Sequence, residues 1–331
     1  MQSFAESAES LYREWRIERI NMLPFRLKPV LKNYLWGGEK LISSWGKESC
    51  AGPLAESWEL AAHKDGDNLI LDGELKNLTL SEAVKRNPEI AAKNFNPENI
   101  FPLMVKLIDS AQPLSIQVHP DDDYARRVEN SKGKTELWYI LDHEPDAFIY
   151  LGFKKEITRF EFEQAIKNNA LLEILNKIKV HRGDSFFIPA GTVHSIGAGI
   201  TLAEIQENSN ITYRVYDYGR AGADGKPREL HIAKALDVAK TCRANLAVPG
   251  SSKNFIVDCE NFSVKKLNIT NSFTEKKNFN SFRFLLCLSG KINLACRNFE
   301  CEISRGGNIF IPADCEEDIY IKGNGEILSV W

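Results

Sequence analysis

Apolar and polar residues alternate over residues 114–119, and this alternation predicts a β-strand with two unlike faces. The apolar face carries Leu114, Ile116 and Val118, and the polar face carries Ser115, Gln117 and His119. Pro120 lacks a backbone N–H group and ends the strand. Because an amide and an imidazole two residues apart have the spacing of ligands to one metal ion, we expect the polar face to point into a barrel.

Most of the remaining chain has the pattern of short strands separated by turns. Strands are predicted at 55–60, 101–108, 134–141, 147–153, 184–188, 200–206 and 213–218, with 147–153 as the hairpin partner of 134–141. Helices are predicted at 78–97, 158–177 and 230–239. From 255 to 331 the pattern is almost entirely strands and turns, so we expect a mainly β protein built as a sandwich or barrel.

One internal repeat supports two related units. Residues 183–190 (GDSFFIPA) are echoed by residues 306–313 (GGNIFIPA), and each copy reads as a tight turn, a strand and a corner that ends in proline. The first copy is soon followed by His194, whereas the second has no histidine nearby. We therefore expect two related β-barrels, of which the first holds a metal site and the second does not.

Composition and charge narrow the classes of function. The chain has 331 residues, of which 43% are hydrophobic and 26% charged, as in a globular protein with a large core. A formal net charge of −3 offers no basic excess for nucleic acid. The region up to Met22 has no apolar run that suits a signal peptide or membrane span, and the seven cysteines are odd in number without a CxxC pair. We expect a cytoplasmic protein with reduced thiols and with neither a nucleic-acid nor a membrane partner.

Two further residues extend the metal hypothesis. Glu136 lies in the predicted strand 134–141, and His194 follows the corner of the first repeat; the candidate ligands are therefore Gln117, His119, Glu136 and His194. Two imidazoles, a carboxylate and an amide oxygen suit Zn²⁺ with an open position, although a two-His, one-carboxylate set could also hold Fe²⁺. Each has an ordinary alternative: His119 could be solvated, Glu136 could form a surface ion pair with Lys134, and His194 could bond to its own turn.

A group of cations lies in apolar or aromatic strand sequence, where an unpaired charge is costly. It consists of Lys106, Lys134 and Arg214, and Arg220 follows Gly219. Glu136, Glu204 and Asp217 could neutralise these cations as internal salt bridges. A bound phosphate could do the same, because lysine offers it a point charge and arginine a bidentate fork. The proximity of three cations to the predicted metal strands favours a small phosphorylated ligand.

Three stretches resemble the type I mannose-6-phosphate isomerases of the cupin superfamily, in their short bacterial form. They are residues 115–120 (SIQVHP), residues 134–139 (KTELWY) and the run 191–220. The resemblance implies two cupin-type jelly-roll barrels with N-terminal helices and a helical insertion at about 156–178. It divides the chain into an N-terminal extension (1–22), which is helix-prone, a catalytic cupin domain (23–240) and a second, metal-free cupin-like domain (241–331).

The resemblance also implies roles for individual residues. It gives one Zn²⁺ per chain held by Gln117, His119, Glu136 and His194, an active-site arginine at Arg214, and a pocket carboxylate at Glu204. Ser115, Lys106 and Lys134 are implied to contact the sugar or its phosphate. The sequence departs from the family pattern at Asn210, where Asp is expected, and at Ala55, where Gly is frequent.

The implied reaction interconverts mannose 6-phosphate and fructose 6-phosphate through a cis-enediol or enediolate. A metal ion would stabilise the developing charge as a Lewis acid, and Arg214 would add a fixed positive charge. Lys134, Glu204 and a metal-bound water are all candidates for the general base. A non-catalytic sugar-phosphate-binding cupin and an iron-dependent cupin oxygenase are the alternatives. We expect a monomer or homodimer.

Overall fold

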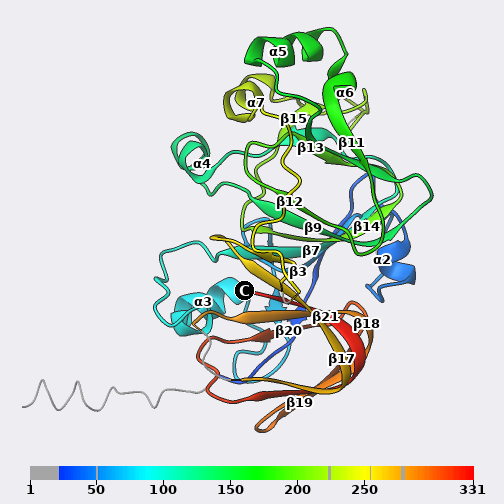
Figure 1. Ribbon diagram of the computed structural model, residues 1–331. Helices are drawn as coiled ribbons and strands as arrows, with labels where there is room; N and C mark the ends of the chain where they lie inside the picture. Colours follow the sequence, from blue (N-terminus) through cyan, green and yellow to red (C-terminus); the bar gives the residue numbers. More distant parts are fainter. Residues whose placement is uncertain (1–21, 50, 223–224, 254, 277–279) are drawn as a thin grey trace, which may run out of the picture.

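Figure 1 shows a computed structural model of the chain, which describes residues 22–49, 51–222, 225–253, 255–276 and 280–331. Strands dominate these residues, so the expectation of a mainly β protein is confirmed. The predicted N-terminal extension lies outside them, apart from Met22. No helix in this part of the chain is long and apolar enough to cross a membrane. The six cysteines that it contains are free thiols.

Two sheets form the upper half of the molecule in Figure 1. The first has the strand order β11-β10-β13-β8-β15, with β11 (Leu175–Lys179), β10 (Phe148–Phe153), β13 (His194–Ile196), β8 (Ile116–Val118) and β15 (Tyr213–Tyr216). The second has the order β12-β9-β14-β7-β3-β2, with β12 (Ser185–Ile188), β9 (Glu136–His143), β14 (Ile200–Glu207), β7 (Leu103–Ser110), β3 (Glu56–Leu60) and β2 (Val30–Lys32).

The two sheets pack face to face around one apolar cluster. Trp138 and Ile140 of β9 contribute from one sheet, and Ile149 and Leu151 of β10 contribute from the other. The prediction that 147–153 forms a hairpin with 134–141 is therefore wrong, because β9 pairs with β12 and β14 while β10 pairs with β11 and β13. The chain crosses from one layer to the other between these strands, and alternation alone cannot reveal such a crossing.

A third sheet forms the lower half of the molecule. Its order is β16-β17-β21-β18-β19 with β20 paired to β18, and its strands are β16 (Val257–Asp258), β17 (Ser263–Glu275), β21 (Ile319–Val330), β18 (Arg283–Cys296), β19 (Phe299–Ser304) and β20 (Asn308–Ile311). The two copies of the repeat take the same local form. Gly183 and Gly306 both have positive φ, and each precedes a four-residue strand, β12 or β20.

An aromatic cluster joins the third sheet to the N-terminal part of the chain. The ring of Phe310 in β20 lies 5.0 Å from that of Phe25 and 5.1 Å from that of Phe282. Phe101, just before β7, stacks on Phe282 at 5.1 Å. These residues and the buried side of helix α3 belong to a single core cluster. The upper and lower halves therefore share their largest apolar core.

The helices lie on the periphery of the sheets (Figure 1). They are α2 (Lys40–Ser43), α3 (Leu80–Arg86), α4 (Asp122–Glu129), α5 (Arg159–Lys167), α6 (Leu171–Ile174), α7 (Ile232–Val238) and the 3₁₀ helix η1 (Pro88–Ile90). Two small two-stranded sheets complete the fold: β1 (Leu27–Lys28) with β6 (Leu69–Ile70), and β4 (Ala62–His63) with β5 (Gly66–Asp67).

Two predicted helices are shorter than their apolar patterns suggest. The helix expected at 158–177 ends at Lys167, because Asn169 adopts a left-handed conformation, and the chain pairs with β10 from Leu175 onward. Tertiary pairing here overrides local helical propensity. The helix expected at 78–97 has its N-cap at Thr79, whose side chain forms a capping box with Glu82. It ends at Arg86, since Pro88 restricts the residue before it.

Candidate metal centre and adjoining cavity

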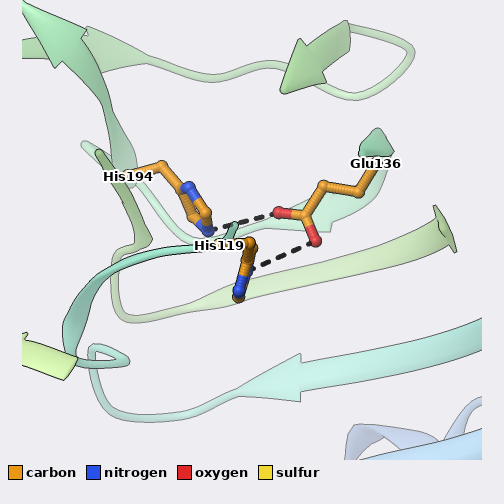
Figure 2. Close-up of side chains that lie close together, drawn as sticks. All are labelled: His119, Glu136 and His194. Atoms are coloured by element: carbon orange, nitrogen blue, oxygen red, sulfur yellow. Dashed lines mark ion pairs between the residues drawn. The ribbon is translucent and has the colours of Figure 1, made fainter. Parts of the chain in front are cut away.

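Three buried side chains from the two facing sheets converge on one point (Figure 2). His119 follows β8, His194 begins β13, and Glu136 begins β9 in the opposite sheet. Nε2 of His194 lies 3.2 Å from Oε1 of Glu136, and Nε2 of His119 lies 3.8 Å from Oε2. The three candidate ligand atoms all lie within 4.8 Å of one another, and no side chain is more than 1% exposed. One ion of ordinary size could contact all three.

Both imidazoles are oriented by backbone carbonyl groups. Nδ1 of His119 donates to the carbonyl of Ile211 at 2.7 Å, and Nδ1 of His194 donates to that of Thr192 at 2.8 Å. Because a carbonyl only accepts, each Nδ1 carries the proton, and each Nε2 offers a lone pair toward Glu136. Nε2 of His119 is buried and has no hydrogen-bond partner among the described residues. An orphaned, oriented nitrogen of this kind fits a metal ligand.

Burial sets the protonation of the cluster. It lowers the pKa of His119 well below its usual value and that of His194 to about 4, so both rings are neutral at pH 7, as metal binding requires. Burial also raises the pKa of Glu136 to about 7, against the opposing charge of Lys134. A divalent cation at this point would favour the ionised carboxylate and remove the cost of burying it.

Gln117 lies beside the cluster in the middle of three paired strands. In β8 it is opposite His194 of β13 on one side and Arg214 of β15 on the other. Its amide nitrogen is placed 3.4 Å from Nε2 of His194. Rotation of the amide by half a turn would exchange its nitrogen and oxygen, which are similar in size, and present the oxygen to the same space. The structure thus brings all four candidate ligands together.

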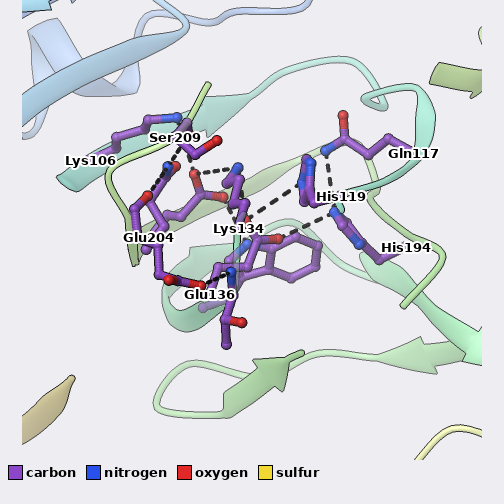
Figure 3. A network of polar contacts seen from close by, with 12 residues as sticks. Lys106, Gln117, His119, Lys134, Glu136, His194, Glu204 and Ser209 are labelled. Atoms are coloured by element: carbon purple, nitrogen blue, oxygen red, sulfur yellow. Dashed lines mark hydrogen bonds and ion pairs between the residues drawn. The ribbon is translucent and has the colours of Figure 1, made fainter. Parts of the chain in front are cut away.

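A network of buried charges continues from the cluster along the second sheet (Figure 3). Nζ of Lys134 lies 2.8 Å from Oε2 of Glu136 and 3.4 Å from Oε1 of Glu204, and Nζ of Lys106 lies 3.2 Å from the same Glu204 oxygen. Nε1 of Trp138 donates to the other oxygen of Glu204 at 2.9 Å. The two lysines therefore form the internal salt bridges that the sequence offered as the alternative to a bound phosphate.

These contacts fix the charge states of the network. Burial raises the pKa of Glu204, but Lys134 and Lys106 outweigh it and bring the pKa to about 2. Burial lowers the pKa of Lys134, but Glu136 and Glu204 outweigh it and raise the pKa above its usual value. At neutral pH, Glu204 is therefore a carboxylate and Lys134 an ammonium ion.

A cavity of about 270 Å³ adjoins the network. Six of the residues singled out in the sequence line it: Lys106, Ser115, Gln117, Lys134, Glu204 and Arg214. Nη1 of Arg214 donates to the carbonyl of Glu229 at 3.0 Å, while its buried Nε has no partner among the described residues. Burial, and then the neighbouring Arg228, lower the pKa of Arg214. The cavity can therefore accept a small polar anion close to the three-residue cluster.

The structure also decides between several of the readings that the sequence left open. His119 is not solvated and Glu136 is not at the surface, because the residues are 1% and 0% exposed. Two further residues of the cavity wall, Glu56 and Arg228, were not among the expected site residues. Glu56 precedes Trp58 by two positions in a predicted strand, so alternation could have placed it on the same face of that strand as Trp58. Arg228 lies in an irregular loop, where no periodicity marks it.

Comparison with known proteins assigns the chain to a family. A family model described as the catalytic domain of type I phosphomannose isomerase matches residues 24–162, and a model described as the cupin domain of mannose-6-phosphate isomerase matches residues 251–331. A protein of Bacillus subtilis named probable mannose-6-phosphate isomerase GmuF is 37% identical over 316 residues, which cover 92% of this chain and 98% of that protein.

Two further relatives agree. Mannose-6-phosphate isomerase ManA of Bacillus subtilis is 34% identical over 297 residues, which cover 87% of this chain and 93% of that protein. The crystal structure of the mannose 6-phosphate isomerase from Bacillus subtilis matches with a TM-score of 0.87 and 32% identity, over 94% of this chain and all of that one. The chain therefore belongs to the type I mannose-6-phosphate isomerase family.

Proposed function

We propose that the protein interconverts mannose 6-phosphate and fructose 6-phosphate. The observation that carries the proposal is the position of the buried His119–Glu136–His194 cluster, whose imidazoles are neutral, beside a cavity lined by cations. Together with family membership, it provides both parts that such an aldose–ketose isomerase needs. One part binds a metal ion at the reacting carbons, and the other accepts a phosphorylated sugar.

The donor set fits a borderline divalent ion. His119, Glu136 and His194 would hold the ion, with the amide oxygen of Gln117 as a fourth ligand, and we propose Zn²⁺ because two imidazoles and one carboxylate are a common zinc set. When bound, the ion would act as a Lewis acid toward the sugar oxygens at C1 and C2. Its lack of redox chemistry is no disadvantage, because the reaction moves a proton and has no net oxidant.

The protein's own groups would move the proton. Glu204 is ionised and can accept the proton that leaves one carbon, and Lys134 is protonated and can stabilise or protonate the enediolate oxygen. We therefore propose Glu204 as the base and Lys134 as its acidic partner. Arg214 would place a fixed positive charge beside the developing negative charge without changing its protonation. Ser115 and Lys106 would contact the substrate from the cavity wall.

The finer architecture is part of the same proposal. We propose that the two facing sheets (23–240) form a catalytic jelly roll, with α5 and α6 as its helical insertion. We propose that 241–331, which includes the third sheet, forms a second jelly roll whose role is structural. The repeat shared by β12 and β20 supports this division. A cytoplasmic location and a monomeric or homodimeric state complete the proposal.

A coupled assay for conversion of mannose 6-phosphate, run before and after complete chelation, tests the function. We expect turnover that chelation abolishes and Zn²⁺ restores. Turnover that survives removal of all metal would overturn the metal-assisted reaction. Binding of mannose 6-phosphate without turnover would indicate a sugar-phosphate-binding protein. Consumption of O₂ with Fe²⁺, independent of phosphate on the substrate, would instead indicate an oxygenase.

A further inference from the structure

The two lysines of the cavity are already neutralised by carboxylates. Lys106 pairs with Glu204 at 3.2 Å and lies 3.8 Å from Glu56, and Lys134 pairs with Glu136 at 2.8 Å. Two ammonium groups therefore face three carboxylates at the end of the cavity next to the metal cluster. This end has no excess positive charge, and a phosphate dianion placed there would meet the carboxylates as well as the lysines.

A second charged group, which reaches the cavity through Arg214 and Arg228, has the reverse balance. Asp217, whose side chain is 5% exposed, accepts two bonds from Arg228, with Nε at 2.6 Å and Nη2 at 2.5 Å, and one from Nη2 of Arg220 at 2.5 Å. Arg214 makes no ion pair with any carboxylate in the part of the chain that the structure describes. Three guanidinium groups thus lie near one buried carboxylate, which two of them bind directly, and this leaves an excess of positive charge in the group.

Arg228 lies where an anion in the cavity could contact this excess positive charge. It lines the cavity of the cluster together with Arg214, and it also lines an adjoining cavity of about 290 Å³ together with Arg220. Its side chain is 28% exposed, and that of Arg220 is 19% exposed. The fork of Arg228 is held in place by Asp217, and Nη1 of Arg220 donates to the carbonyl of Pro113 at 2.6 Å. Both groups are therefore oriented before a ligand arrives, which lowers the entropic cost of binding.

We propose that Arg228, positioned by Asp217, binds the phosphate group of the hexose phosphate between the two cavities, with Arg214 and Arg220 contributing charge. The inference rests on the proposed function. Arginine suits this task, because its planar fork can pair with phosphate oxygens while a second edge stays on Asp217. A phosphate held by these arginines would direct the other end of the sugar toward Gln117 and the metal cluster. Lys106 and Lys134 then serve the reacting carbons and are not the main phosphate ligands.

The first test compares a phosphorylated with an unphosphorylated substrate. In Arg228→Gln we expect the ratio of kcat/KM for mannose 6-phosphate to kcat/KM for mannose to fall about 10²-fold, mainly through KM, because a charged contact to a remote group is lost. Arg228→Lys should fall less, since it keeps the charge but loses the fork. Arg126→Gln, which removes an exposed arginine on α4, is the matched control and should leave the ratio unchanged.

The second test measures binding without catalysis. Calorimetric titration of the metal-free protein with mannose 6-phosphate, and separately with inorganic phosphate, should give affinities that fall about 10²-fold in Arg228→Gln. Asp217→Asn should weaken binding of both anions by a smaller factor, because it loosens the arginine that makes the contact. An unchanged substrate ratio together with unchanged affinity for both anions in Arg228→Gln would overturn the inference.

The same experiments separate this inference from the proposed function. If wild-type protein shows no metal-dependent isomerisation of mannose 6-phosphate, the proposed function fails and the phosphate assignment fails with it. If wild-type protein is active and Arg228→Gln has the same substrate ratio and anion affinities as wild type, the phosphate assignment alone fails. If instead Lys106→Met lowers phosphate affinity while Arg228→Gln does not, the phosphate lies at the lysine end of the cavity, and the inference is again overturned.

Discussion

Oε1 of Glu136 lies 3.2 Å from Nε2 of His194, although the two residues begin strands in different sheets. The contact joins the two sheets and creates a site that neither sheet could form alone. The site is costly without a cation, since it buries a carboxylate and two imidazole lone pairs.

Removal of either imidazole should remove the metal and the activity together. For His119→Ala and His194→Ala we expect metal content near zero, in place of one ion per chain, and turnover below detection. Elemental analysis of purified protein checks this directly. His181→Ala, which changes a largely exposed histidine, is the control and should retain both. A His194→Ala protein with one tightly bound ion per chain would contradict the assignment.

The metal-free protein should lose stability as the pH falls from about 6.5 toward 4. The pKa of His194 is about 4 in the folded state against about 6.5 in the unfolded chain, so unfolding takes up a proton in this window. His119 acts in the same direction, while Glu136, with its raised pKa, opposes them. The contribution of His194 is up to about 1.4 kcal/mol per pH unit.

Urea denaturation of chelated protein at several pH values measures this slope. The matched variant His194→Gln should show a slope shallower by up to about that amount between pH 6 and 4.5, because glutamine does not titrate. Equal slopes for the two proteins would show that His194 binds protons equally in the folded and unfolded states, which would contradict its lowered pKa.

Neutralisation of Glu204 should destabilise the fold as well as slow the reaction. In Glu204→Gln the amide can still accept from Trp138, but Lys106 and Lys134 lose a buried carboxylate, which should cost about 3–5 kcal/mol in the free energy of unfolding. Loss of the proposed base should lower kcat by about 10²–10⁴-fold. Glu163→Gln removes an exposed pair with Lys167 and should change neither quantity measurably. Unaltered kcat would exclude Glu204 as the base.

Truncation of Arg214 should affect the chemical step more than metal binding. We expect Arg214→Ala to keep one metal ion per chain, because Arg214 is not in the ligand cluster, and to lower kcat by about 10²-fold or more. Steady-state kinetics combined with elemental analysis separates these effects. A near-normal kcat would remove Arg214 from the mechanism, and loss of metal would show that it supports the ligands.

The two halves of the molecule should unfold together. Phe310→Ala should cost about 3–5 kcal/mol, because the ring is fully buried against Phe25 and Phe282. Deletion of residues 255–331 should give insoluble protein, since it uncovers Phe25 and Phe101. Phe160→Ala, at a ring that is 67% exposed, is the control for stability. A soluble, active protein after the deletion would show that the first half folds alone.

The strands and the cluster could be predicted from the sequence because they depend on alternation. Strands β7, β9 and β14 lie within about two residues of their predicted bounds, and His119, Glu136 and His194 converge as expected. Alternation assigns a residue to a face of a sheet. It therefore predicts which side chains point inward once the buried face of the strand is known.

The pairing partners of the strands and the positions of loop residues could not be predicted from alternation. Nothing in the local pattern of 134–153 shows that β9 and β10 belong to different sheets, because partners are set by the whole topology. The end of α5 at Lys167 depends on β11 pairing with β10, which is a long-range contact. Arg228 reaches the cavity from a loop without periodicity, so its position depends on Asp217, which is eleven residues away.

Gln117 is opposite both His194 and Arg214 within a strand of only three residues. A shift of β8 by one residue would exchange its amide for the aliphatic side chains of Ile116 or Val118 and turn the amide toward the opposite side of the sheet. Inserted or deleted residues are therefore incompatible with this strand, whereas replacement of single side chains is not. The candidate metal centre therefore constrains the length of this strand.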